Sequence, residues 1–157
     1  MTTNTGRYIR AVLWDMDGTL MDSQPLWDES FRRCCQERGG TVTPEQVASI
    51  AGASIARTCE LIAETGATAS PEDPATAEVF ARISAQVEAA VRADPPILPG
   101  ARSITSTLSE IGLAQVIVTQ SPRPIVEAVA HALGDVFVDL VTGDDGLPGK
   151  PTPAPYA

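Results

Sequence analysis

Two carboxylates, Asp15 and Asp17, stand two residues apart, directly after a short apolar run that ends at Trp14. Carboxylates this close repel each other unless a cation lies between them, and a hard divalent ion with oxygen ligands, most naturally Mg²⁺, suits such a pair. Gly18 permits a tight turn behind them. An Asp-Gly turn leaving a strand would explain Asp17 and Gly18, but not the acid at position 15. The pair is therefore the first candidate for chemistry.

The elements that must position this pair can be predicted from apolar runs and their punctuation. Residues 9–14, 114–119 and 136–141 form three short β-rich runs whose near-continuous apolarity is typical of a parallel sheet covered on both faces. Helical signals cover residues 24–38, 43–46, 54–66, 74–93, 98–111 and 121–133. The order strand, helical insert, helix, strand, helix, strand predicts the start of a doubly wound α/β domain.

Composition narrows the class of protein. The chain has 157 residues, 43% of them hydrophobic, and a formal net charge of −9, which predicts a globular protein and disfavours nucleic acid and anionic membranes as partners. Apolar runs stay far below the roughly 20 residues of a membrane span. The polar segment 1–7 is not typical of a signal peptide, so we expect a cytoplasmic protein. Cys34, Cys35 and Cys59 are then expected to be reduced, and His131 to be an ordinary helix residue.

The segment Asp15-Met16-Asp17-Gly18-Thr19-Leu20 resembles the first motif of the haloacid dehalogenase-like (HAD) superfamily. The resemblance implies that Asp15 is the nucleophile that forms an aspartyl-phosphate and that Asp17 is the general acid and base. It also implies Mg²⁺ bound by the Asp15 carboxylate and the Asp17 backbone carbonyl, with Gly18 and Thr19 beside the substrate. Members that displace halide lack the second aspartate, so Asp17 favours phosphoryl transfer.

Two further segments resemble the family's second and third motifs. Thr119, followed by Gln120, would hold a phosphoryl oxygen through its hydroxyl and the next backbone N–H; the alternative is ordinary capping before a helix. Lys150, the only lysine of the chain, stands in a Gly-Lys-Pro-Thr-Pro segment that resembles the third motif. A cation is needed there to offset the charge gathered by Asp15, phosphate and metal. A solvated tail lysine is the alternative for Lys150.

The helical insert resembles the cap that many HAD phosphatases carry between their first two motifs. It predicts an α/β core domain at residues 1–22 and 96–157 and a cap domain at residues 23–95. Residues 51–54 resemble the substrate-facing loop, which makes Gly52 a candidate for substrate binding. Ile55 stands where related phosphohexomutases carry arginine, which weakens a mutase reading. Arg57 could substitute, although an arginine on a helix is more often solvated.

The family's fourth motif is an acidic pair on the strand that follows the lysine, and no such pair follows Lys150 in this sequence. Asp144 and Asp145 precede the lysine, and Asp139 is expected in the middle of a strand, so none of them is a substitute. We therefore expect an incomplete Rossmann-like sheet of three strands and weak or absent Mg²⁺ binding. The first strand is expected at an unpaired edge, which favours instability or self-association.

These residues together predict a Mg²⁺-dependent phosphomonoester hydrolase that acts on a small, sugar-type phosphate through an aspartyl-phosphate. One alternative is a non-catalytic, truncated or degenerate HAD fragment that lacks the acidic metal motif. A phosphohexomutase-like member is the other. The expected partner is a small phosphorylated metabolite, and the sequence does not name it.

Overall fold

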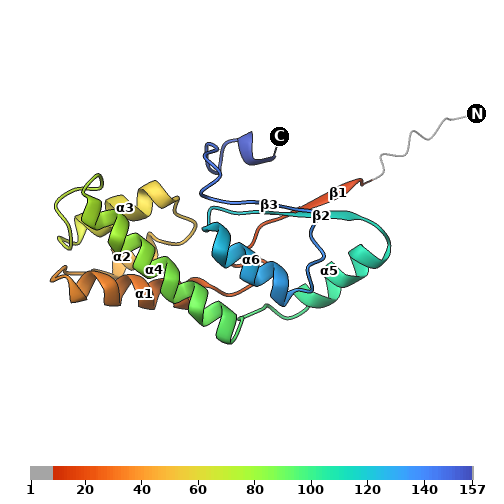
Figure 1. Ribbon diagram of the computed structural model, residues 1–157, viewed down its shortest axis with the longest axis horizontal. Coiled ribbons are helices and arrows are strands. Elements are labelled where there is room, and N and C mark those ends of the chain that lie inside the picture. The colour runs from red at the N-terminus through yellow and green to blue at the C-terminus, as the bar shows by residue number, and fades with distance from the viewer. Residues whose placement is uncertain (1–8, 157) are drawn as a thin grey trace, which may run out of the picture.

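The computed structural model describes residues 9–156, so the N-terminal segment 1–7, for which no signal-peptide character was expected, lies outside the described residues. Over these residues a strand, five helices, a strand, a helix and a strand follow one another in the predicted order (Figure 1). The elements are β1 (Ala11–Trp14), α1 (Gln24–Glu37), α2 (Pro44–Ala48), α3 (Ile55–Glu64), α4 (Pro74–Ala93), α5 (Ala101–Glu110), β2 (Ala114–Val118), α6 (Arg123–Ala132), β3 (Asp139–Val141) and the 3₁₀ turn η1 (Ala154–Tyr156).

The sheet is parallel, has three strands in the order β1-β2-β3, and confirms the predicted α/β class. Leu13 pairs with Val116, which in turn pairs with Asp139. Within residues 9–156, β2 is the one strand that pairs with β1, so β1 lies at an edge as expected.

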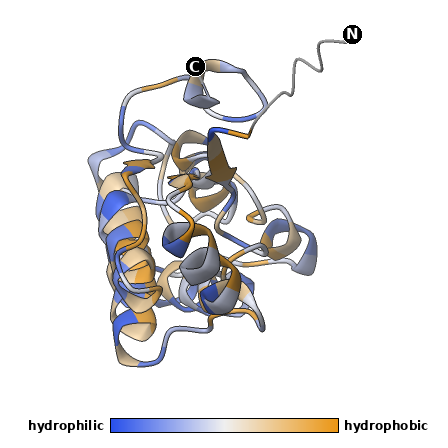
Figure 2. Cartoon of the chain, turned by 90° about the vertical axis from the view of Figure 1, so that its right-hand side faces the viewer, coloured by the Kyte–Doolittle hydropathy of each residue, from blue (hydrophilic) through white to orange (hydrophobic). Residues whose placement is uncertain are grey.

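Within the described residues, the crossover helices lie on one face of the sheet. Both crossovers, β1 to β2 and β2 to β3, advance in the same direction, and right-handed crossovers of that kind place their helices on one face. Figure 1 shows α5 and α6 on one side of the sheet. Gln115 and Ile117 face that side and are fully buried, whereas Leu13, on the opposite face of β1, is 45% exposed. Figure 2 shows the strands as mainly hydrophobic and the helices as two-faced.

Local sequence signals place most helix ends correctly. Helix α4 spans residues 74–93 as predicted, with the Asp73 carboxylate accepting from the Ala75 N–H. Thr43 and Gln46 form a reciprocal capping box at α2, and the Ser54 hydroxyl accepts from the Arg57 N–H at α3. The third strand is shorter than expected: it begins at Asp139 rather than at residue 136, so Asp139 opens the strand instead of lying mid-strand.

Two buried clusters form the hydrophobic core, and α4 contributes to both. Val79 and Ile83 pack with the residues of α1 and α3, whereas Val87 and Val91 pack against α6 and the sheet. Cys34 and Cys35 are buried in the first of these clusters, and the three cysteines are free thiols. Over residues 9–156, no helix combines the length and apolar character needed to cross a bilayer.

Candidate active site

A tight turn after β1 positions the two carboxylates. Three successive backbone N–H groups, those of Thr19, Leu20 and Met21, donate to the Met16 carbonyl at 2.8–3.2 Å. Gly18 adopts the left-handed φ of 79° that this turn requires. Met16, Leu20 and Met21 are fully buried, so the turn is anchored in the core while its acidic side chains remain at the carboxyl end of the sheet.

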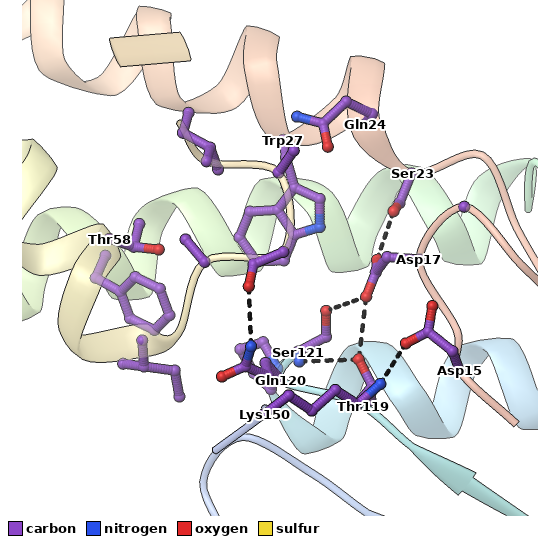
Figure 3. A pocket seen from close by; sticks show the side chains of 18 of the residues that line it. Asp15, Asp17, Ser23, Gln24, Trp27, Thr58, Thr119, Gln120, Ser121 and Lys150 are labelled. Atoms are coloured by element: carbon purple, nitrogen blue, oxygen red, sulfur yellow. Dashed lines mark hydrogen bonds and ion pairs between the residues drawn. The ribbon is translucent and has the colours of Figure 1, made fainter. Parts of the chain in front are cut away.

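The Asp17 carboxylate is surrounded by hydroxyl groups. The Thr119 and Ser121 hydroxyls, which follow β2, donate to Asp17 Oδ2 at 3.1 and 2.7 Å, and the Ser23 hydroxyl donates to Oδ1 (Figure 3). The Ser121 backbone N–H also donates to the Thr119 hydroxyl at 3.1 Å, which fixes that side chain. Asp17 thus links the turn after β1, the end of β2 and the start of α1.

Asp15 has a different environment. Its Oδ1 accepts from Lys150 Nζ at 2.5 Å and its Oδ2 from the Thr19 hydroxyl at 3.1 Å. The Asp15 side chain is 47% exposed and that of Lys150 21% exposed. The Lys150 ammonium also lies 5.9 Å from the centre of the Tyr156 ring. The more accessible of the two carboxylates therefore carries the ion pair.

These groups line one pocket of about 540 Å³. Seven of the eight predicted site residues line it: Asp15, Asp17, Gly18, Gly52, Thr119, Gln120 and Lys150. Thr19 does not line the pocket and contacts Asp15 instead. His131 is exposed on α6, where it pairs with Asp135, and lies outside the pocket lining.

Residues from the helical insert form the opposite wall. The loop before α3 contributes Ile50, Gly52 and Ala53, while α1 contributes Trp27 and α4 contributes Phe80. Gln120 joins the two sides, because its Nε2 donates to the Gly52 carbonyl at 2.9 Å. A Cβ at Gly149 would lie 2.5 Å from Gln120 Oε1, so a side chain there would require the Gln120 amide to move.

Sequence reasoning missed four of the residues that shape this pocket: Ser23, Trp27, Phe80 and Ser121. Trp27 and Phe80 stand at apolar positions of helical segments, and that spacing carries no sign of a pocket. Ser121 stands two residues after Thr119, and that spacing is the one signal that could have suggested a second hydroxyl.

The remaining candidates lie elsewhere. Arg57, which could have replaced a cap arginine, pairs with Glu60 at 2.7 Å and Glu64 at 2.8 Å, and these hydrogen bonds raise its pKa. Ile55 lines the pocket in its place.

Asp144 and Asp145 stabilise the turn after β3. Arg123 donates from its backbone N–H to Asp144 and from its guanidinium to Asp145 at 2.6 Å. Burial disfavours the Asp145 carboxylate, but hydrogen bonds from Arg123 and the Thr142 backbone outweigh it and lower its pKa. Both acids are thus engaged in a structural turn and do not line the pocket, as expected.

The carboxylate oxygens of the pocket are the candidate ligands for a metal ion. Among residues 9–156, no three side chains of His, Cys, Asp or Glu gather closely enough to hold one. Both oxygens of Asp15 and both of Asp17 have protein partners. Mg²⁺ is commonly held by one or two carboxylates together with substrate phosphates and waters, so these residues fit a Mg²⁺ that depends on bound phosphate for its remaining ligands.

Comparison with known proteins identifies the class. The family model for haloacid dehalogenase-like hydrolases matches residues 9–157, so the chain belongs to that family. Hexitol phosphatase B of Escherichia coli K12 is 30% identical over 158 residues, covering 98% of this chain and 69% of that protein. Phosphoglycolate phosphatase of Rhodobacter capsulatus is 30% identical over 146 residues, with 91% of this chain and 66% of that protein covered.

Solved structures show the same fold. CbbY of Rhodobacter sphaeroides in complex with phosphate superposes with a TM-score of 0.76 at 22% identity, covering 95% of this chain and 70% of that one. The beta-phosphoglucomutase of Clostridium difficile gives 0.77 at 17% identity, with 95% and 68% covered. The chain therefore spans about two thirds of the length of these relatives.

Proposed function

We propose that this site hydrolyses a small phosphate monoester through an aspartyl-phosphate on Asp15. The observation that carries the proposal is the meeting of Asp15, Asp17, Thr119 and Lys150 in one pocket, although they come from three distant parts of the chain. The phosphatase relatives at 30% identity support the same reaction class.

The proposed reaction has two steps. In the first, an Asp15 carboxylate oxygen attacks phosphorus, the bond to the ester oxygen breaks, and protonated Asp17 gives its proton to the leaving alkoxide. In the second, water attacks the aspartyl-phosphate while Asp17 takes up a proton from it, which releases phosphate and restores Asp15. The chain thus returns to its starting state.

The surrounding residues bind and orient the phosphoryl group. Lys150, already within 2.5 Å of Asp15, offsets the negative charge that gathers when phosphate enters. The Thr119 hydroxyl and the Gln120 backbone N–H would hold a phosphoryl oxygen at the end of β2. Mg²⁺, when bound by the Asp15 carboxylate and the Asp17 carbonyl, would supply further charge neutralisation.

The helical insert is proposed to act as a cap, with the boundaries expected from sequence: residues 23–95 as cap, and 1–22 with 96–157 as core. Trp27, Ile50 and Phe80 would exclude bulk water from the phosphate, and water exclusion strengthens the electrostatic contacts inside. Because Val87 and Val91 of α4 pack in the core cluster, the last turns of the cap are firmly attached to the core.

A second candidate is a module that binds phosphate without turnover. The observation in its favour is that no third acidic side chain joins Asp15 and Asp17 within the described part of the chain. A phosphohexomutase-like activity is less well supported, because Ile55 and not a cation lines the pocket at the start of α3.

The test is phosphate release from p-nitrophenyl phosphate in the presence of Mg²⁺. We expect Asp15→Asn to abolish release, because an amide is a poor nucleophile. Glu72→Gln, which removes one negative charge from an exposed loop, is the control and should retain full activity. Equal rates for Asp15→Asn and the parent chain would contradict the nucleophile assignment. Phosphate binding by calorimetry without turnover would favour the second candidate.

A further inference from the structure

Beyond the phosphate-facing groups, the pocket has a wall that the proposed chemistry does not use. Its apolar side chains come from three elements of the insert: Trp27 from α1, Ile50 and Ile55 from the loop and start of α3, and Phe80 from α4. Ile50 is 6% exposed and belongs to a buried cluster, and the partly buried Trp27 and Phe80 pack against that cluster. Such a surface suits an organic group that gains from leaving water.

The polar groups on this side are uncharged. Gln24 and Thr58 line the pocket, and both are labelled in Figure 3. Gln24 Nε2 donates one N–H to Asp28 at 2.5 Å, and its carbonyl oxygen can serve as an acceptor. An acceptor of this kind can receive a hydrogen bond from a hydroxyl group.

The described residues of the lining offer no unpaired cation to a ligand. Among the described residues that line the pocket, Lys150 is the single cation, and it is already paired with Asp15. Arg57 does not help, because Glu60 and Glu64 engage its guanidinium away from the pocket. A second anionic group on a ligand would therefore lose its water without gaining a cation.

From this charge pattern, and resting on the proposed phosphatase function, we infer that the pocket selects monoesters whose organic part is uncharged. Aryl and polyol monophosphates fit, because they offer apolar surface to Trp27 and Phe80 or hydroxyls to Gln24. Phosphoglycolate and bisphosphates do not fit, because their second anion would face the apolar wall, where the lining offers no cation. The named relatives do not decide this, since a hexitol phosphatase and a phosphoglycolate phosphatase are equally identical to the chain.

The experiment is calorimetric titration of the full chain at neutral pH without added Mg²⁺, so that the esters bind without being hydrolysed. The four probes are inorganic phosphate, phenyl phosphate, sorbitol 6-phosphate and 2-phosphoglycolate. We expect phenyl phosphate and sorbitol 6-phosphate to bind at least about tenfold more tightly than phosphoglycolate. The reason is that the carboxylate of phosphoglycolate loses water and finds no cation on the wall, and an unpaired charge weakens binding by at least about tenfold. Phosphoglycolate binding as tightly as phenyl phosphate would overturn the inference.

Inorganic phosphate distinguishes failure of the ester selectivity from failure of the phosphate site itself. If it binds while the esters show no such order, the inference is wrong and the phosphate site stands. If neither inorganic phosphate nor any ester binds, the proposed phosphate site is wrong, and the inference fails with it.

A charge-addition variant tests the stated cause. Ile55→Arg places a cation on the wall and should strengthen phosphoglycolate binding about tenfold relative to phenyl phosphate. Ala85→Arg adds the same charge at an exposed position of α4 outside the pocket lining and should leave the order unchanged. Ala53→Arg, at a second lining position, provides the same test if Ile55→Arg lowers the melting temperature. An unchanged order in the folded lining variants would contradict the electrostatic cause.

Discussion

The surroundings of Asp17 suit a group that alternates between two protonation states. Ser23, Thr119 and Ser121 all present hydroxyls, and a hydroxyl can donate to a carboxylate or accept from a carboxylic acid by rotating its hydrogen. Backbone N–H groups or a cation would stabilise only the carboxylate. Asp15 instead accepts hydrogen bonds from the Lys150 ammonium and the Thr19 hydroxyl. The two acids thus have environments matched to different proposed roles.

This difference leads to a prediction about Ser121. Removing its hydroxyl with Ser121→Ala takes away the 2.7 Å contact that orients Asp17. We expect the rate of p-nitrophenyl phosphate hydrolysis to fall about tenfold, since positioned proton transfer contributes ~10²–10⁴ in rate and two hydroxyls remain. The affinity for inorganic phosphate should be unchanged by calorimetry. Ser109→Ala, an exposed serine of α5, is the control. Equal losses of rate and phosphate affinity would show that Ser121 acts on binding instead.

At the scale of elements, the limits of a helix could be predicted where capping residues and prolines flank it. Asp73 and Pro74 begin α4 and Asp94 with Pro95 ends it, so its limits could be predicted without tertiary contacts. The third strand could not be predicted this well. Its first paired residue is Asp139, because that residue meets Val116, and pairing between strands is a non-local property. Residues 136–138 have strand-like side chains but lie before this register.

In the candidate site, too, local sequence motifs mark some residues, whereas others depend on non-local packing. Asp15, Asp17, Thr119 and Lys150 could be found because short motifs mark them at strand ends, where parallel strands bring their carboxyl ends together. Trp27 and Phe80 could not, because whether a helix residue lines a pocket depends on how α1 and α4 pack over the sheet. Thr19 differs from the other predicted residues, because the turn directs its hydroxyl to Asp15 and it does not line the pocket.

The packing of α1 against α3 and α4 gives a pH-dependent prediction. Cys35 is completely buried there, and burial raises the pKa of its thiol from 9.0 to about 11, although the hydrogen bond with Thr65 opposes the shift. The thiolate is disfavoured only in the folded chain, so this contribution is fully present below about pH 9 and is lost as pH rises towards about 11. Urea midpoints should therefore fall over that interval, and Cys35→Ala should show a smaller fall. Parallel profiles for the two chains would refute the assignment.

At the scale of the whole molecule, the position of the helices and the strand order together leave β1 exposed on one face and at one edge. Helices α5 and α6 lie on one face of the sheet, and within residues 9–156 the outer edge of β1 has no strand beside it. Leu13 lies on the open face of that same strand at 45% exposure. An apolar edge strand with unpaired backbone groups is a template for pairing with another chain. The described residues therefore carry an exposed strand edge that can pair with a second chain, in addition to the pocket.

We accordingly expect the 157-residue chain to self-associate through β1, and Leu13→Lys to reduce that association. A lysine on an edge strand must stay hydrated, so it opposes pairing with a second chain while leaving the buried face of β1, with Trp14 and its partner Gln115, intact. Sedimentation velocity over a range of concentrations should show a concentration-dependent shift for the parent chain and a smaller one for Leu13→Lys. Ile104→Lys is the matched control, because Ile104 is 48% exposed but lies on α5, away from the edge. A monodisperse parent monomer with a cooperative melt would mean that β1 is protected despite its position, and an equal effect of both lysines would mean that general surface charge, not the strand edge, governs association.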